Sequence, residues 1–289
     1  MHNYINCMAH NSSEGQLLIG EEQTALFDCG MAFCAGETIR NVQNALKDKP
    51  LDYIFMTHTH YDHIGALPFF LKTWPKARVV TSAAGAAVLL KDTPRRVIRE
   101  LSVNAAKTHG VAHNLEYSDD LFKADIIVSD GDTISLGGLS VTVLETPGHT
   151  RDSLCFFIPE LEMLILNETP GVLMPDGTMY PCYLTNYNDT INSIEKCRKI
   201  PYKFLSLPHW GIAEEKDANG YFDKALETNS VCRDFILDMK NKQYNEEKML
   251  ELFYQKYGSE VLLTYQPKEA FIANASATIK CTLSSSLSE

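Results

Sequence analysis

The stretch Thr57-His58-Thr59-His60-Tyr61-Asp62-His63 places three imidazoles and a carboxylate close together in the chain. It follows Asp52-Tyr53-Ile54-Phe55-Met56, an apolar run typical of a buried strand. Side chains alternate along a strand, so His58 and His60 point to the same side, whereas Asp62 and His63 fall on the turn into the next helix and can face a second point nearby. Imidazole nitrogens bind ions such as zinc, and a carboxylate adds compensating charge. The segment therefore predicts a site for two adjacent metal ions.

The alternative interpretation of this segment is a surface loop that happens to be rich in histidine. The chain has nine histidines in 289 residues, and three of them fall here. Such a concentration directly after a hydrophobic strand favours the metal site.

Two further histidines follow predicted strands. His149 comes directly after the strand expected over 139–145, and His209 directly after the strand expected over 204–207. Taken alone, each would be typical of a hydrogen-bonded structural histidine. Since residues at strand ends often build a site at one edge of a sheet, we expect both to join the first cluster.

Apolar patterning predicts an α/β fold with helices packed on mixed sheets. Strands are expected over 16–20, 25–30, 52–57, 77–81, 125–128, 139–145, 153–158, 163–166 and 204–207, and helices over 37–47, 64–71 and 189–198. Beyond residue 212 the pattern changes to long helices over 217–239, 246–257 and 267–279. We therefore expect a core domain over 1–212 and a helical extension over 213–289 that caps the site or forms a dimer surface.

Composition narrows the classes of function. The formal net charge is −11, and no block of Lys and Arg could supply a basic face, so we expect no nucleic-acid partner. No apolar run approaches the roughly 20 residues of a spanning helix, and the start of the chain does not resemble a secretory signal. The eight cysteines are scattered without a Cys-x-x-Cys pair, which is typical of reduced thiols. A cytoplasmic protein acting on a small molecule, without a membrane partner, is the expectation.

These motifs resemble the metallo-β-lactamase fold superfamily of metallohydrolases. The likeness rests on the HxHxDH pattern, the TPGHT segment, the late histidine before glycine, and the Asp-x-Gly turn that ends Ala25-Leu26-Phe27-Asp28-Cys29-Gly30. It covers about residues 10–212 and implies a four-layer αβ/βα sandwich with two metals at one edge. By this likeness His58, His60 and His149 bind one metal, whereas Asp62, His63 and His209 bind the other.

One position departs from the family pattern. Where the family usually has glycine followed by an aspartate that bridges both metals, this chain has Asn167 followed by Glu168. The Glu168 side chain is one methylene longer than the family's aspartate. It can bridge both metals if its backbone lies farther from them, or it can bind one ion only.

The resemblance implies hydrolysis by water activated between two divalent ions, with zinc favoured and iron or manganese as alternatives. Asp62 would be both a ligand and the group that orients the water and passes on a proton. The substrate would carry an ester-type bond: thioester, lactone or phosphodiester. One alternative is a metal-binding regulatory module with little turnover. The other is a diiron oxidoreductase, a group whose pattern has glutamate in place of His60 and commonly adds a flavin domain.

Two other segments are candidates for the surroundings of the site. Residues 171–187 contain Tyr180, Tyr183 and Tyr187 and could either line the pocket mouth or serve as a packing segment. His109 and His113 are spaced i, i+4, and we expect them to face solvent rather than the metals.

Overall fold

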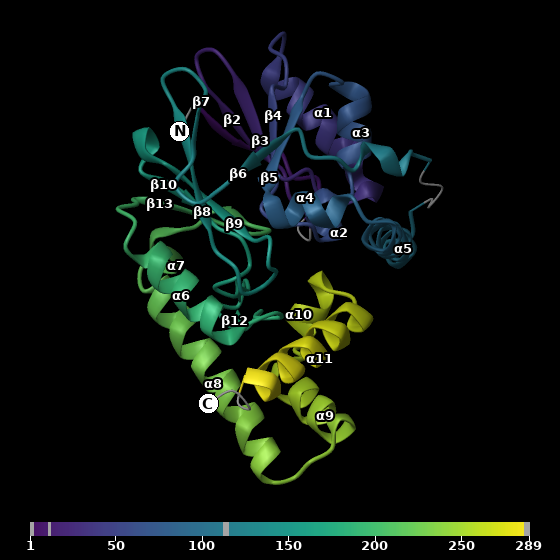
Figure 1. The fold of residues 1–289 in the computed structure, drawn as a ribbon, viewed down its shortest axis with the longest axis vertical. Coiled ribbons are helices and arrows are strands. Elements are labelled where there is room, and N and C mark those ends of the chain that lie inside the picture. Colours follow the sequence, from purple (N-terminus) through teal and green to yellow (C-terminus); the bar gives the residue numbers. More distant parts are fainter. Residues whose placement is uncertain (1–2, 11–12, 112–115, 286–289) are drawn as a thin grey trace.

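The computed structural model describes residues 3–10, 13–111 and 116–285. This part of the chain contains two six-stranded sheets that face each other (Figure 1). The first sheet has, in spatial order, β1 (Tyr4–Asn6), β2 (Gln16–Ile19), β3 (Thr24–Phe27), β4 (Tyr53–Phe55), β5 (Arg78–Ser82) and β6 (Ile126–Val128). The second has β14 (Gly211–Ile212), β13 (Phe204–Leu207), β10 (Met163–Ile165), β9 (Leu154–Ile158), β8 (Ser140–Glu145) and β7 (Thr133–Ser135).

Helices cover the outer faces of both sheets. Those on the side of the first sheet are α1 (Ala35–Leu46), α2 (Tyr61–Ile64), α3 (Leu67–Thr73), α4 (Ala83–Leu89) and α5 (Asp92–Thr108). The later ones are α6 (Tyr187–Arg198), α7 (Glu215–Ala218), α8 (Tyr221–Asn241), α9 (Glu246–Tyr257), α10 (Glu260–Tyr265) and α11 (Lys268–Ser285). Short connections add the 3-10 turns Ala32–Cys34, Asp119–Leu121 and Pro159–Leu161 and the small hairpin of β11 (Val172–Leu173) and β12 (Met179–Tyr180).

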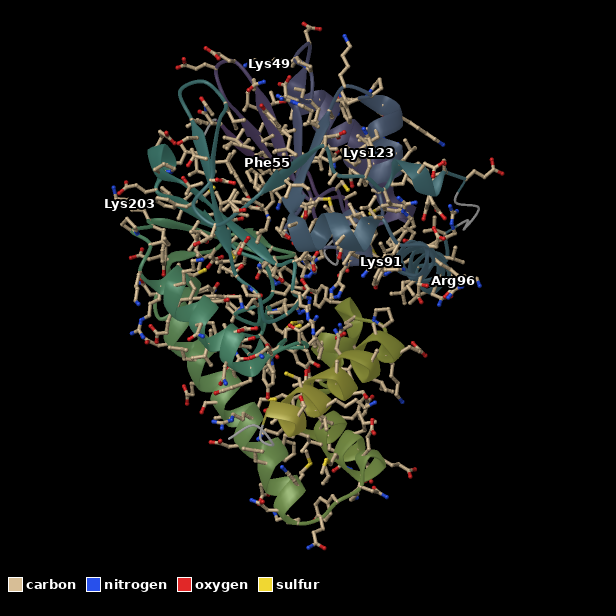
Figure 2. The ribbon with its side chains drawn as sticks, viewed as in Figure 1. Lys49, Phe55, Lys91, Arg96, Lys123 and Lys203 are labelled. Atoms are coloured by element: carbon tan, nitrogen blue, oxygen red, sulfur yellow. The ribbon has the colours of Figure 1, made fainter. Side chains whose placement is uncertain are left out.

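Alternation along the strands builds the layers. In β4, Phe55 packs between the two sheets, whereas its neighbour Ile54 packs beneath the outer helices. Phe27 and Phe156 meet Phe55 in the middle layer, with ring centroids 5.2 and 5.4 Å from it. Figure 2 shows Phe55 inside the molecule, with Lys203 and Arg96 near its left and right edges. The expected αβ/βα sandwich is confirmed.

The helices after residue 212 pack against the rest of the chain. Tyr221 and Phe222 of α8 join the core beneath the second sheet, while Phe271 of α11 packs with Tyr180 and Tyr183 of the segment before α6. In Figure 1, α10 and α11 (yellow) lie below the two sheets. Among the described helices, none is both long and apolar enough to cross a membrane.

The element boundaries differ from the sequence-based expectation at two breaks. The helix expected over 64–71 is interrupted after Ile64, and α3 begins at Leu67 with Pro68 in its first turn, where a proline is tolerated. The helix expected over 217–239 is divided at Gly220, whose φ of 73° favours glycine. The short β1, β7, β11, β12, β14 and α10 are not among the expected elements, because runs this short carry little periodic signal.

Candidate metal centre

The loop after β4 presents the first ligands. His58 lies in the loop, His60 has an extended backbone, and α2 begins directly after His60, so the helix carries Asp62 and His63. The backbone N–H of His63 donates to the carbonyl of His60 at 3.1 Å, which fixes this turn. His58 and His63 are fully buried, whereas the Asp62 side chain keeps 20% of its surface exposed.

The other three candidate ligands come from one edge of the second sheet. β8, β10 and β13 run in the same direction, because β9 is antiparallel to both β8 and β10, and β13 is parallel to β10. His149, Glu168 and His209 follow the carboxyl ends of these three strands. His209 adopts φ 66°, a left-handed conformation that turns the chain back into β14.

The structure brings all seven candidate residues together in two groups that share Glu168. The first group is His58, His60, His149 and Glu168, and the second is Asp62, His63, Glu168 and His209. Within each group the possible ligand atoms all lie within 4.8 Å of one another. This division matches the two ligand sets that the family resemblance implied.

Glu168 lies between the two groups. Its Oε1 is 2.8 Å from Nε2 of His209, and its Oε2 is 2.7 Å from Nε2 of His149. The backbone beside it is held by Asn167, whose side-chain amide donates to Thr146 Oγ1 and whose Oδ1 accepts from the N–H of Thr169, both at 2.7 Å. The longer side chain therefore reaches the position between the groups.

Unpartnered nitrogens provide a test of whether these residues fit a metal. Nε2 of His58 and Nε2 of His63 are buried without a hydrogen-bond partner, although each lies near Oε2 of Glu168, at 3.3 and 3.7 Å. Buried polar atoms in proteins are normally hydrogen-bonded, so two buried ring nitrogens that point to the same carboxylate without a hydrogen bond require an explanation. Imidazole and carboxylate donors that surround one point fit divalent cations, zinc among them.

A second layer of contacts orients the imidazoles. Oδ2 of the buried Asp28 lies 2.8 Å from Nδ1 of His63 and accepts from the Thr57 hydroxyl at 2.6 Å. Nδ1 of His149 lies 2.8 Å from the carbonyl oxygen of Cys182. In both histidines the outer nitrogen is engaged, so the Nε2 atom faces the cluster, an arrangement that fixes the tautomer of metal-binding histidines.

Glu14 holds the backbone of His209, a member of the second ligand group, in place. It is buried, its Oε1 accepts from the backbone N–H of His209, and its Oε2 accepts from the Gln16 side chain at 3.1 Å. The roles of Asp28, Glu14 and the Cys182 carbonyl were not predicted from the sequence. The Asp-x-Gly turn was a signal for Asp28, whereas no pattern pointed to the other two.

The charges in the cluster are strongly coupled. Burial alone would raise the pKa of Glu168, but His149, His209 and His58 outweigh burial and hold that pKa well below its usual range. Burial would lower the pKa of His63, yet the Asp28 and Asp62 carboxylates raise it to about 9. Burial, followed by the neighbouring His58 and His149, holds the pKa of His60 well below its usual value. A neutral His60 can offer a lone pair to a metal ion.

A cavity of about 220 Å³ opens beside the cluster. Its lining includes His60, Asp62 and His149, and its opposite wall is formed by residues of α10 and α11. Val172, Met174 and Tyr180 of the segment 171–187 also line it, whereas Tyr183 and Tyr187 pack among the C-terminal helices. The segment thus both lines the pocket and packs the core.

His109, the described member of the pair His109 and His113, is not in either ligand group. His109 is half-buried rather than solvent-facing, because its ring stacks on Phe33 with centroids 4.8 Å apart. His113 lies outside the described residues. All eight cysteines are buried free thiols.

The chain resembles known proteins in sequence and in fold. Residues 16–209 match the metallo-beta-lactamase superfamily. The chain is 25% identical to the metallo-beta-lactamase fold-containing protein ST1585 of Sulfurisphaera tokodaii over 225 residues, which are 74% of this chain and 79% of that protein. The metallo-beta-lactamase family protein TTHA1429 of Thermus thermophilus has the same fold, with a TM-score of 0.61, 18% identity, and coverage of 99% of this chain and 95% of that one.

Relatives of different activity share the fold. A hydroxyacylglutathione hydrolase of Francisella tularensis is 29% identical over 119 residues, 41% of this chain and 34% of that protein. The rubredoxin-oxygen oxidoreductase of Megalodesulfovibrio gigas is 28% identical over 155 residues, 53% of this chain, and the match spans only 32% of its length. Metal-dependent hydrolases predominate in the superfamily. Since the match spans most of the chain and ends at His209 in the cluster, this protein belongs to the metallo-beta-lactamase superfamily.

Proposed function

We propose that the chain is a binuclear metal-dependent hydrolase that cleaves an ester-type bond in a small molecule. The observation that carries the proposal is the pair of four-residue ligand groups that share Glu168. Hydroxyacylglutathione hydrolases are among the relatives, which supports hydrolysis as the reaction. The cavity beside the cluster, at about 220 Å³, lies below the roughly 300–1,000 Å³ of common ligand pockets and so favours a small substrate.

In this proposal His58, His60 and His149 hold one divalent ion, while Asp62, His63 and His209 hold the other, with Glu168 between them. Zinc is the favoured ion, because imidazoles outnumber carboxylates five to two in this set. When bound, such ions ionise water near neutral pH and polarise the substrate oxygen.

Asp62 is the residue to which we assign proton transfer. Its partly exposed carboxylate lines the cavity, and its Oδ2 lies 3.9 Å from Nε2 of His63. From this position the carboxylate accepts a hydrogen bond from the attacking water, and afterwards delivers the proton to the leaving group.

The overall reaction consumes one water. The water oxygen bonds to the carbonyl carbon or phosphorus, and the bond from that atom to the leaving oxygen or sulfur breaks. One proton of the water ends on the leaving alcohol or thiol, and the other is released by the acid product. No covalent enzyme intermediate is expected.

The wider setting is part of the same proposal. We place the activity in the cytoplasm, without a nucleic-acid or membrane partner, and expect the helices over 213–289 to cap the site or to support a homodimer. The support for excluding nucleic acid is the net charge of −11.

Metal analysis of the purified chain, followed by a panel of thioesters, lactones, esters and phosphodiesters, tests the proposal. We expect two equivalents of metal and turnover of at least one class, both lost in His60→Ala. Bound iron with oxygen- or nitric-oxide-reducing activity would support the diiron alternative. Bound metal without turnover of any class would support the regulatory module.

A further inference from the structure

The walls of the cavity differ in chemistry from the metal cluster at its base. Away from the cluster the lining is largely aliphatic and aromatic: Met31, Leu101, Val172, Met174, Leu262 and Tyr265. Among the described lining residues there is no lysine or arginine. An anionic group on the part of the substrate that lies away from the cluster would therefore lose water contacts without gaining a cationic side chain as partner, which costs free energy.

The wall opposite the cluster carries negative charge. Glu269, Ala270, Ala273 and Asn274 line the cavity from one face of α11, at the spacing of successive helical turns. Glu269 lies in the first turn of this helix, so its carboxylate already complements the positive end of the helix dipole. The neighbouring cation Lys268 does not line the cavity, because its ammonium lies 5.1 Å over the ring of Tyr254.

From this lining we infer that the part of the substrate outside the reacting bond is uncharged and largely apolar, and that it lies against α10 and α11. The inference rests on the proposed function, since it takes the reacting bond to lie at the cluster. It assigns substrate selection to Leu262, Tyr265 and the inner face of α11. Thioesters of glutathione, which carry two carboxylates, are then poor substrates, and acyl esters, lactones or thioesters with neutral leaving groups are good ones.

A matched pair of thioesters separates the two classes. Hexanoyl thioesters of N-acetylcysteamine and of glutathione have the same acyl group and the same reacting bond, and differ in the charge and the size of the thiol part; the lysine variants below separate the effect of charge. For the metal-replete full chain we expect kcat/KM at least tenfold higher for the neutral thioester. A ratio near one, or a preference for the glutathione thioester, would overturn the inference and leave the proposed hydrolase intact.

Two lysine variants of α11 provide the matched control. Ala273→Lys adds a cation to the cavity wall, whereas Ile272→Lys adds the same charge at an exposed residue outside the lining. We expect Ala273→Lys to shift the kcat/KM ratio at least fivefold towards the glutathione thioester, and Ile272→Lys to shift it less than twofold. Equal shifts in both variants would show an effect of overall charge and would contradict the assignment.

Calorimetric titration provides a readout that does not need turnover. The non-reactive thioethers S-hexyl-N-acetylcysteamine and S-hexylglutathione are titrated into the metal-replete chain. Tighter binding of the neutral thioether by at least tenfold supports the inference; equal binding, a reversed order, or no binding of either overturns it. If the neutral thioether binds as expected but no ester-type substrate is hydrolysed, the pocket assignment stands and the hydrolase proposal fails.

Discussion

Oδ2 of Asp28 lies 2.8 Å from Nδ1 of His63, and this contact ties the end of β3 to the metal cluster. The same oxygen accepts from the hydroxyl of Thr57. Asp28 therefore sets the direction of an imidazole without lining the cavity itself. Oδ1 accepts from the backbone N–H of Thr57 at 2.8 Å, so both oxygens of Asp28 must be acceptors, which a carboxylate provides and an amide does not.

Asp28→Asn is expected to weaken metal binding by about 10- to 100-fold. In one orientation the amide NH₂ would face the Thr57 hydroxyl and Nδ1 of His63, and in the other it would face the backbone N–H of Thr57, so one acceptor is lost either way. Competition with a chromophoric chelator measures the change. Asp125→Asn is the matched control. Asp125 accepts from the N–H of Val79 near the start of β5, whereas the metal cluster follows the carboxyl end of the parallel strand β4. Unchanged affinity in Asp28→Asn would show that His63 does not depend on this contact.

Glu168→Asp tests the longer side chain that distinguishes this chain from the family pattern. Asn167 is anchored to Thr146 and Thr169, so the backbone cannot easily advance to compensate for a shorter arm. We expect at least tenfold weaker binding of one of the two metals, equivalent to about 1.4 kcal/mol. Titration with metal-content analysis gives the result, and two ions held as tightly as before would mean that the extra methylene is dispensable.

Metal binding should stabilise the fold, because the ligands from both halves of the chain are brought together only in the folded state. At a free metal concentration 100 times Kd, a single site adds about 2.7 kcal/mol to the free energy of unfolding. Thermal unfolding with and without a chelator should therefore show a clear rise in Tm. Glu168→Gln, which removes the charge shared by both groups, should lose most of this rise; a full rise would indicate that the metal binds elsewhere.

The middle layer between the sheets should be sensitive to truncation. Phe156 is fully buried against Phe27 and Phe55, so Phe156→Ala is expected to lower the free energy of unfolding by about 3–5 kcal/mol. Urea unfolding of the chelator-treated protein measures this. Ile127→Ala, at a side chain that is 59% exposed, should change it by less than about 0.5 kcal/mol. Similar losses in both variants would contradict the layer assignment.

Much of the site could be predicted from the sequence because its ligands follow strands. His58, His60, His149 and His209 each come after an apolar run that is visible without a structure. Their division into two groups came from the family resemblance, and the structure has the same division. Glu168 could be placed beside the cluster, but its reach between the groups depends on how Asn167 is anchored, which no local pattern reveals.

Contacts between distant parts of the chain could not be predicted. Glu14 meets the backbone of His209 across 195 positions, and His149 meets a backbone carbonyl of Cys182 that any residue type could supply. The six residues of α10 are too few for a periodic signal, yet Leu262 and Tyr265 complete the cavity. The set of residues that line the cavity is therefore visible only in the folded chain.

Anomalous diffraction from a metal-replete crystal tests the central claim most directly. The account predicts two peaks, one among His58, His60 and His149 and one among Asp62, His63 and His209, with the Glu168 carboxylate between them. A single peak would contradict the assignment of a binuclear centre. No peak at the cluster, with these side chains turned away from one another, would contradict the metal-dependent hydrolase itself.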